Sequence, residues 1–146
     1  MKAVTAIEAI AAAVILLWVY TAASKLADLE NFRKQLTAQN FTIGNLNLLL
    51  WSIPLSELLC TGLLLFKKTR MIGFLCSSLL LLLFTLYIVL TLVGYFDRVP
   101  CACGGVLKQM GWEAHLYFNL FWLLLTVSGT FLSGSLRRKE VRFKRS

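Results

Sequence analysis

The chain has 146 residues, enough for one domain, and 58% of them are hydrophobic against 15% charged, with a mean hydropathy of +0.74. Soluble domains average about half apolar and a quarter charged residues, so this composition excludes an ordinary soluble domain. The net charge of +8 also gives no support to nucleic-acid binding, because the basic residues lie in short segments beside long apolar runs, as in membrane proteins.

The first apolar run covers residues 4–23 and is long enough to cross a bilayer, which takes about 20 residues. A cleaved signal peptide ending near Ser24 is the alternative interpretation. Glu8 interrupts the apolar run, and Trp18 and Tyr20 lie where an interfacial aromatic belt is expected. These three residues favour a membrane span.

Residues 24–44 carry apolar side chains at helical spacing, with charged residues between them. This pattern predicts a short amphipathic helix on the membrane surface. A solvated loop is the alternative. The apolar positions are Leu26, Leu29, Phe32 and Leu36.

The second span is predicted at residues 45–66, and the third, which is the most apolar, at residues 71–96. A basic turn at residues 67–70 joins them. Four polar or helix-breaking residues of the second span fall on one helical face, which we expect to point into the bundle. They are Asn47, Pro54, Glu57 and Thr61.

The fourth span is predicted at residues 112–132, followed after Gly134 by a flexible basic tail at residues 136–146. Its polar-leaning stripe consists of His115, Asn119, Trp122 and Thr126. The chain is therefore predicted to form one all-α domain over residues 1–146, an antiparallel bundle of four transmembrane helices.

Charge bias predicts the orientation, since cytoplasmic segments of membrane proteins are rich in Lys and Arg. One side of the predicted bundle carries ten basic residues: Lys2, Lys67, Lys68, Arg70, Arg137, Arg138, Lys139, Arg142, Lys144 and Arg145. The other carries five: Lys25, Arg33, Lys34, Arg98 and Lys108. We therefore expect both termini in the cytoplasm of a bacterial inner membrane, and residues 97–111 on the periplasmic side, an oxidising compartment.

Residues 97–111 contain Cys101 and Cys103, separated by one residue. Such a pair can close into a small strained disulfide, and strained, exposed disulfides tend to be redox-active. Arg98 and Lys108 are nearby cations that can stabilise a thiolate. A static structural disulfide is one alternative, and a metal site with His115 as third ligand is another, although two cysteines lack the four-ligand pattern of structural zinc.

Cys60 and Cys76 flank the basic turn at residues 67–70 almost symmetrically. At about 1.5 Å per residue, the two thiols are expected at similar depths. They are candidates for a second redox pair that relays electrons across the membrane. The alternative is that both act as small buried hydrophobic residues.

Glu57 is the residue least expected inside a bilayer, where an acidic side chain costs about 2.5–3.5 kcal/mol on insertion scales. We expect it to be protonated or paired with Lys25 or His115. It is a candidate for carrying protons coupled to thiol oxidation or for lining a quinone pocket. A purely structural interhelical hydrogen bond is the alternative.

His115 is the only histidine, and Asn119 lies one helical turn deeper in the fourth span. His115 is a candidate base for a thiol or hydrogen-bond donor to a quinone carbonyl. The alternative for His115 is a polar cap at the start of the helix, and Asn119 is expected to share whichever role applies.

Three short motifs resemble the MauE family of methylamine-utilisation proteins, which is similar to DoxX-type four-helix membrane proteins. The first is residues 20–26 followed by Phe32, the second is residues 54–57 with Gly62, and the third is the segment 101–104 before the last span. The resemblance covers nearly the whole length.

The resemblance implies an inner-membrane protein with a Cys-x-Cys loop and a thioredoxin-like periplasmic partner, which together mature disulfide-rich proteins such as methylamine dehydrogenase. The family pattern favours glycine between the cysteines and an aromatic residue after the second, whereas this chain has Ala102 and Gly104 there. This departure bears on the identity of the partner.

The predicted function is thiol–disulfide exchange at Cys101 and Cys103, as in a thiol–disulfide oxidoreductase, with quinone as a candidate cofactor. A non-catalytic membrane scaffold or assembly factor with a structural disulfide is the alternative. A small-molecule carrier that uses Asn47, Glu57 and His115 is a third interpretation.

Overall fold

A computed structural model of the chain describes residues 2–38, 45–94 and 111–145. Within these ranges every regular element is an α-helix, namely α1 (Lys2–Ala27), α2 (Leu29–Ala38), α3 (Leu46–Leu65), α4 (Arg70–Leu92) and α5 (Trp112–Arg145). Four helical stretches are long and apolar enough to cross a membrane: Ala3–Ala27, Leu46–Leu65, Arg70–Leu92 and Trp112–Arg138. The prediction of an all-α protein with four membrane spans is confirmed.

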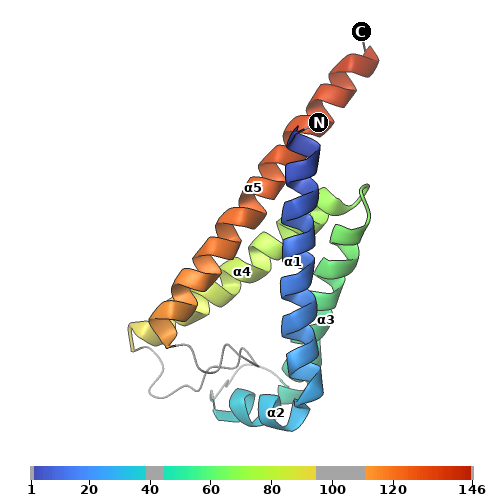
Figure 1. Cartoon of the computed structure of the whole chain (residues 1–146). Coiled ribbons are helices and arrows are strands. Elements are labelled where there is room, and N and C mark those ends of the chain that lie inside the picture. Colours follow the sequence, from blue (N-terminus) through green and yellow to red (C-terminus); the bar gives the residue numbers. More distant parts are fainter. Residues whose placement is uncertain (1, 39–44, 95–110, 146) are drawn as a thin grey trace.

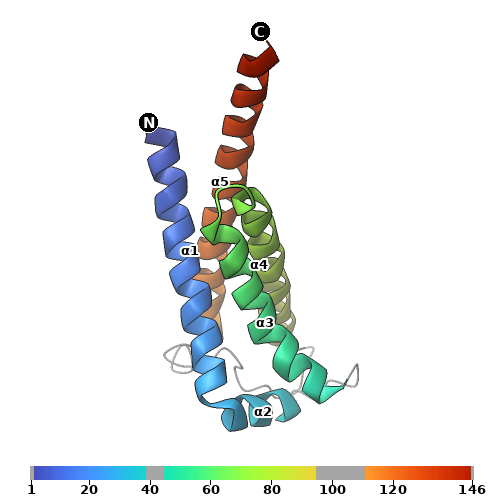
Figure 2. The same cartoon turned by 90° about the vertical axis from the view of Figure 1, so that its right-hand side faces the viewer.

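The four long helices form two pairs, α1 with α3 and α4 with α5. Both termini and the α3–α4 turn lie at one end of the bundle (Figures 1 and 2). Toward the other end the two pairs diverge, and α2 lies across that end, roughly perpendicular to the long helices (Figure 1). We call this the α2 end.

Two glycines allow close helix packing away from the α2 end. A Cβ atom at Gly73 would lie 2.9 Å from the backbone nitrogen of Leu64, so α4 approaches α3 more closely than any side chain permits. A Cβ atom at Gly129 would lie 2.7 Å from the ring of Phe74, so α5 approaches α4 in the same way. The helices are therefore tightly packed where these glycines lie.

The turn between α3 and α4 satisfies the backbone at the end of α3. The Thr69 hydroxyl donates to the carbonyl oxygens of Leu63 (2.8 Å) and Phe66 (3.3 Å), and Arg70 Nε donates to that of Leu64 (3.2 Å). Carbonyl groups in the last turn of a helix lack intrahelical donors. These side chains supply the missing bonds and hold α3 and α4 antiparallel.

The start of α2 is fixed by Asp28, which receives hydrogen bonds from the backbone nitrogen and side-chain amide of Asn31 at 3.2 and 3.1 Å. Such a cap satisfies free backbone donors in the first turn. Phe32 and Leu36 are buried against α3, whereas Arg33 and Lys34 are exposed. The expected amphipathic helix is present, but it begins only at Leu29.

The beginning of the expected surface segment belongs to α1, which continues to Ala27. Lys25 is therefore in the last turn of a membrane-spanning helix and is buried, with 5% of its surface exposed. It faces the interior of the bundle rather than the membrane surface.

The expected polar face of the second span is only partly correct. Pro54, Glu57 and Thr61 are buried, as predicted. Asn47 is exposed, because it lies in the first turn of α3, where its side-chain oxygen accepts a hydrogen bond from Arg33 Nη2 at 3.1 Å. The prediction that Asn47 faces the interior is wrong.

The expected basic tail is helical in the structure, since α5 continues to Arg145. Residues 135–145 contain no proline, and the single Gly134 costs only about 1 kcal/mol relative to alanine within a helix. Nothing in this sequence interrupts the helix where the apolar run ends.

Candidate functional site

A buried ion pair joins α1 to α3 near the α2 end. Lys25 Nζ lies 2.7 Å from Glu57 Oε1, and the two side chains are 5% and 1% exposed. Lys25 Nζ also donates to the Thr21 carbonyl oxygen at 3.3 Å. The sequence left Lys25 and His115 open as partners of Glu57, and in the structure the partner is Lys25. The pairing compensates two charges that would each be costly in an apolar interior.

The ion pair faces a cavity of about 250 Å³ lined by residues of all five helices. His115 and Asn119, both buried on α5, line it with Lys25 and Glu57. The structure therefore brings Glu57, His115 and Asn119 together with Lys25, which the sequence offered only as a partner of Glu57.

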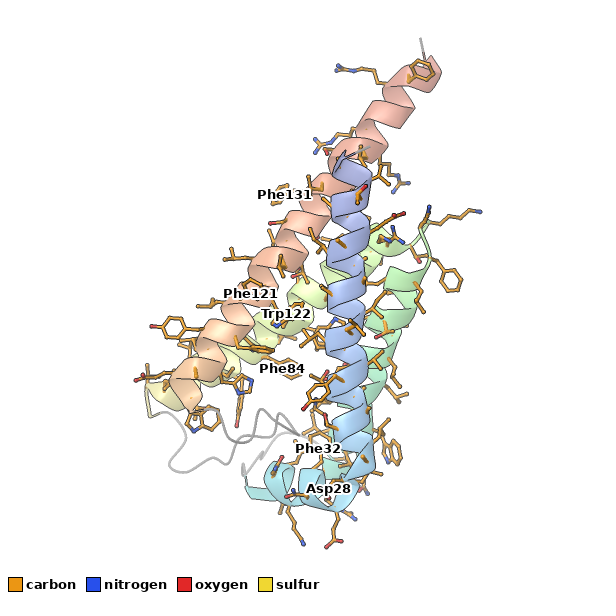
Figure 3. The ribbon with its side chains drawn as sticks, viewed as in Figure 1. Asp28, Phe32, Phe84, Phe121, Trp122 and Phe131 are labelled. Carbon is orange, nitrogen blue, oxygen red and sulfur yellow. The ribbon has the colours of Figure 1, made fainter. Side chains whose placement is uncertain are left out.

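The remaining wall of the cavity is mostly apolar, with aromatic side chains among aliphatic ones. Phe84 lies between α4 and α1, and Phe32 approaches from the α2 end (Figure 3). Other lining residues are Trp18, Leu81, Ile53 and Phe118. The cavity thus combines a polar cluster with a surface suited to a flat apolar molecule.

Two buried polar atoms of this cluster have no hydrogen-bond partner among the described residues, and these are Glu57 Oε2 and Asn119 Nδ2. Thr21 lies close to Glu57, but its hydroxyl hydrogen-bonds the Trp18 carbonyl oxygen at 3.2 Å. An unsatisfied buried donor or acceptor costs about 1–3 kcal/mol, and such groups require an explanation. Here an acceptor and a donor line the same cavity.

Trp18, which lines the cavity, is held in place by a buried hydrogen bond. Its indole Nε1 donates to Ser77 Oγ at 2.9 Å, and both residues are almost fully buried. This bond links α1 to α4 across the middle of the bundle. The assignment of Trp18 to an interfacial aromatic belt is therefore wrong, because its side chain is 1% exposed within the core. Ser77 within the most apolar span was the sequence signal of a buried polar partner.

Cys60 and Cys76 are both free thiols in the hydrophobic core near the α3–α4 turn. Cys60 is buried and Cys76 is partly buried. Both cysteines thus pack as small hydrophobic side chains do. Electron relay between them stays a prediction.

Cys101, Cys103 and Arg98 lie outside the described residues, as does Lys108. The segment that contains them joins Gly94, just after α4, to Gly111, just before α5. Both attachment points are at the end of the bundle where α4 and α5 line the cavity through Phe84 and His115. Among the described residues, no group of three or more His, Cys, Asp or Glu side chains is placed to hold a metal ion.

The comparisons with known proteins agree with this architecture. The family model for methylamine utilisation protein MauE matches residues 2–132, which include all four membrane spans up to Leu132 of α5. The comparisons with curated proteins and with solved structures gave no significant match. On the extent of this match, the chain belongs to the MauE family of methylamine utilisation proteins and is a multi-pass membrane protein.

Proposed function

We propose that this protein is a membrane thiol–disulfide oxidoreductase whose active pair, Cys101 and Cys103, faces the periplasm. It exchanges disulfides with a thioredoxin-like partner and so supports maturation of disulfide-containing proteins such as methylamine dehydrogenase. Family membership supports a role in methylamine utilisation, and the residues of this chain supply the chemistry.

The observation that carries the proposal is the position of the buried polar cluster. Lys25, Glu57, His115 and Asn119 lie at the same end of the bundle to which the cysteine-containing segment is attached. Oxidation of a dithiol releases two protons with two electrons, so an oxidoreductase needs groups nearby that handle protons. A carboxylate and an imidazole are such groups.

The orientation of the bundle supports the same proposal. The end with both termini and the α3–α4 turn carries most of the basic residues, and the positive-inside bias assigns that end to the cytoplasm. The α2 end is then periplasmic, where disulfides form and persist.

Trapping of a mixed disulfide tests the proposal. Exchange proceeds through a mixed disulfide, which accumulates when the second cysteine is missing. In cells, we expect one of the variants Cys101→Ser and Cys103→Ser to accumulate a reducible adduct with another protein. A membrane-impermeant maleimide should label the wild-type pair only after mild reduction.

The matched control is Cys76→Ser, which removes a core thiol and should form no adduct. If neither loop variant forms an adduct and the pair resists mild reductant, the disulfide is structural. The scaffold function would then replace the one proposed here.

A further inference from the structure

We propose that the cavity at the α2 end binds the ring of a lipid-soluble quinone, which accepts the electrons of the Cys101–Cys103 dithiol. This inference rests on the proposed function and names its electron acceptor. The size of the cavity agrees with one substituted ring, since an apolar cavity of about 150 Å³ can hold benzene and this cavity has about 250 Å³.

The unpartnered atoms fit the two redox states of such a ring. Asn119 Nδ2 can donate only, and a quinone carbonyl oxygen accepts. As a carboxylate paired with Lys25, Glu57 offers Oε2 as an acceptor, and a quinol hydroxyl donates. A quinone satisfies Asn119 Nδ2 alone. The quinol satisfies both atoms, because its hydroxyl groups donate to Glu57 Oε2 and accept from Asn119 Nδ2, whereas a hydrocarbon satisfies neither.

Aromatic side chains of the cavity fit the faces of the same ring. Trp18, Phe84 and Phe118 line the cavity beside the polar cluster. Aromatic rings pair favourably in stacked or edge-to-face arrangements, beyond the gain from buried area alone. The cavity therefore offers contacts to both the edge and the face of a quinone.

The cavity also reaches the lipid-facing surface. Leu83 on α4 is among its lining residues, yet 55% of Leu83 is exposed. This residue lies within a membrane-spanning helix. The apolar tail of a lipid-soluble quinone can extend into the bilayer there, while its ring lies among the five helices.

The reaction balances without a further reactant. Two S–H bonds of the dithiol break and one S–S bond forms, which releases two electrons and two protons. The quinone takes up both electrons and both protons, so its two carbonyl groups become hydroxyl groups. Glu57 and His115 both line the cavity, and a carboxyl group and an imidazole are groups that can transfer these protons.

Binding can be tested separately from electron transfer. The purified variant Cys101→Ser/Cys103→Ser keeps the cavity but cannot exchange disulfides. We expect ubiquinone-1 to quench its tryptophan fluorescence saturably, because Trp18 lines the cavity. Adding Asn119→Leu, which removes the donor at nearly unchanged size, should weaken binding at least tenfold.

The matched control is Asn47→Leu, an exposed asparagine outside the cavity. It should leave ubiquinone-1 binding unchanged. Circular dichroism and gel filtration establish that each variant is folded. Quenching that does not saturate, or equal affinity in folded Asn119 and Asn47 variants, would contradict the site.

Electron transfer is tested on the reduced protein with its native cysteines. Ubiquinone-1 should yield one quinol for each pair of thiols lost, at least tenfold more slowly in Asn119→Leu. If mixed disulfides are trapped in cells but no quinol forms, the quinone inference fails and thiol exchange stands. If quinone binds saturably but no mixed disulfide is ever trapped, the proposed function fails instead.

Discussion

Glu57 has a charged partner on another helix, and this partner explains how the carboxylate is tolerated within a membrane span. The 2.7 Å contact with Lys25 is almost fully shielded from solvent. A buried ion pair offsets the cost of burying each charge, but it adds little stability compared with a well-packed apolar pair. A gain in stability alone therefore does not account for the pair.

The ion pair makes an asymmetric prediction for stability. Lys25→Met leaves Glu57 as an uncompensated buried charge and should lower the free energy of unfolding by about 3–5 kcal/mol. The double variant Lys25→Met/Glu57→Leu removes both charges and should recover most of this loss. Thermal unfolding in detergent measures both, and equal destabilisation by the single and double variants would contradict the pairing.

At the scale of the helix, two glycines determine where the spans are close. Gly73 brings α4 against the backbone of α3, and Gly129 brings α5 against Phe74. Small residues at such contacts are typical of helix packing in membranes, where close van der Waals contact replaces the hydrophobic effect. The helices converge at these points and diverge toward the α2 end, which leaves room for the cavity.

A matched pair of alanine substitutions tests this packing. A Cβ atom at Gly73 would meet the backbone nitrogen of Leu64 at 2.9 Å, so Gly73→Ala must push α3 and α4 apart and should cost about 1–3 kcal/mol. Gly62 on α3 has nothing within 4 Å of its Cβ position. Gly62→Ala should therefore stabilise the helix by about 0.5–1 kcal/mol.

Thermal unfolding of the two glycine variants should shift in opposite directions. Both substitutions add the same methyl group to a membrane-spanning helix, so their difference isolates the contact between α3 and α4. If Gly73→Ala is as stable as Gly62→Ala, the close approach of these helices is not required.

At the scale of the whole molecule, the two ends of the bundle carry different residues and elements. One end holds both termini, the basic α3–α4 turn and the contact between Lys67 Nζ and Glu8 Oε1 at 3.4 Å. The other holds α2, the buried polar cluster and the attachment points of the cysteine-containing segment. The proposed function requires the second end to face the periplasm.

Cysteine accessibility tests this orientation in bacterial cells. In a background with Cys101→Ser and Cys103→Ser, a membrane-impermeant maleimide should label Thr37→Cys on α2 in intact cells. Lys68→Cys in the α3–α4 turn should be labelled only after permeabilisation. Both positions are exposed, so the difference reports the side of the membrane. The reverse pattern would place the cysteines in the cytoplasm and overturn the proposed function.

The sequence alone determined the membrane class, the number of spans and the approximate position of each. Hydropathy is a local property, and a bilayer requires a fixed length of apolar helix whatever the neighbours are. Because a charged residue within an apolar span is evident from the local sequence, Glu57 stands out without knowledge of its neighbours. The short motifs also indicated the MauE family, which the family match confirms.

Only the tertiary structure decided which residues meet. In the structure Glu57 pairs with Lys25, Trp18 hydrogen-bonds Ser77, and Asn47 is exposed. It also assembled one cavity from residues on five helices. Such contacts depend on how the helices cross and how far they diverge. Those crossings follow from close packing at a few small residues, which the hydropathy of any one segment does not record.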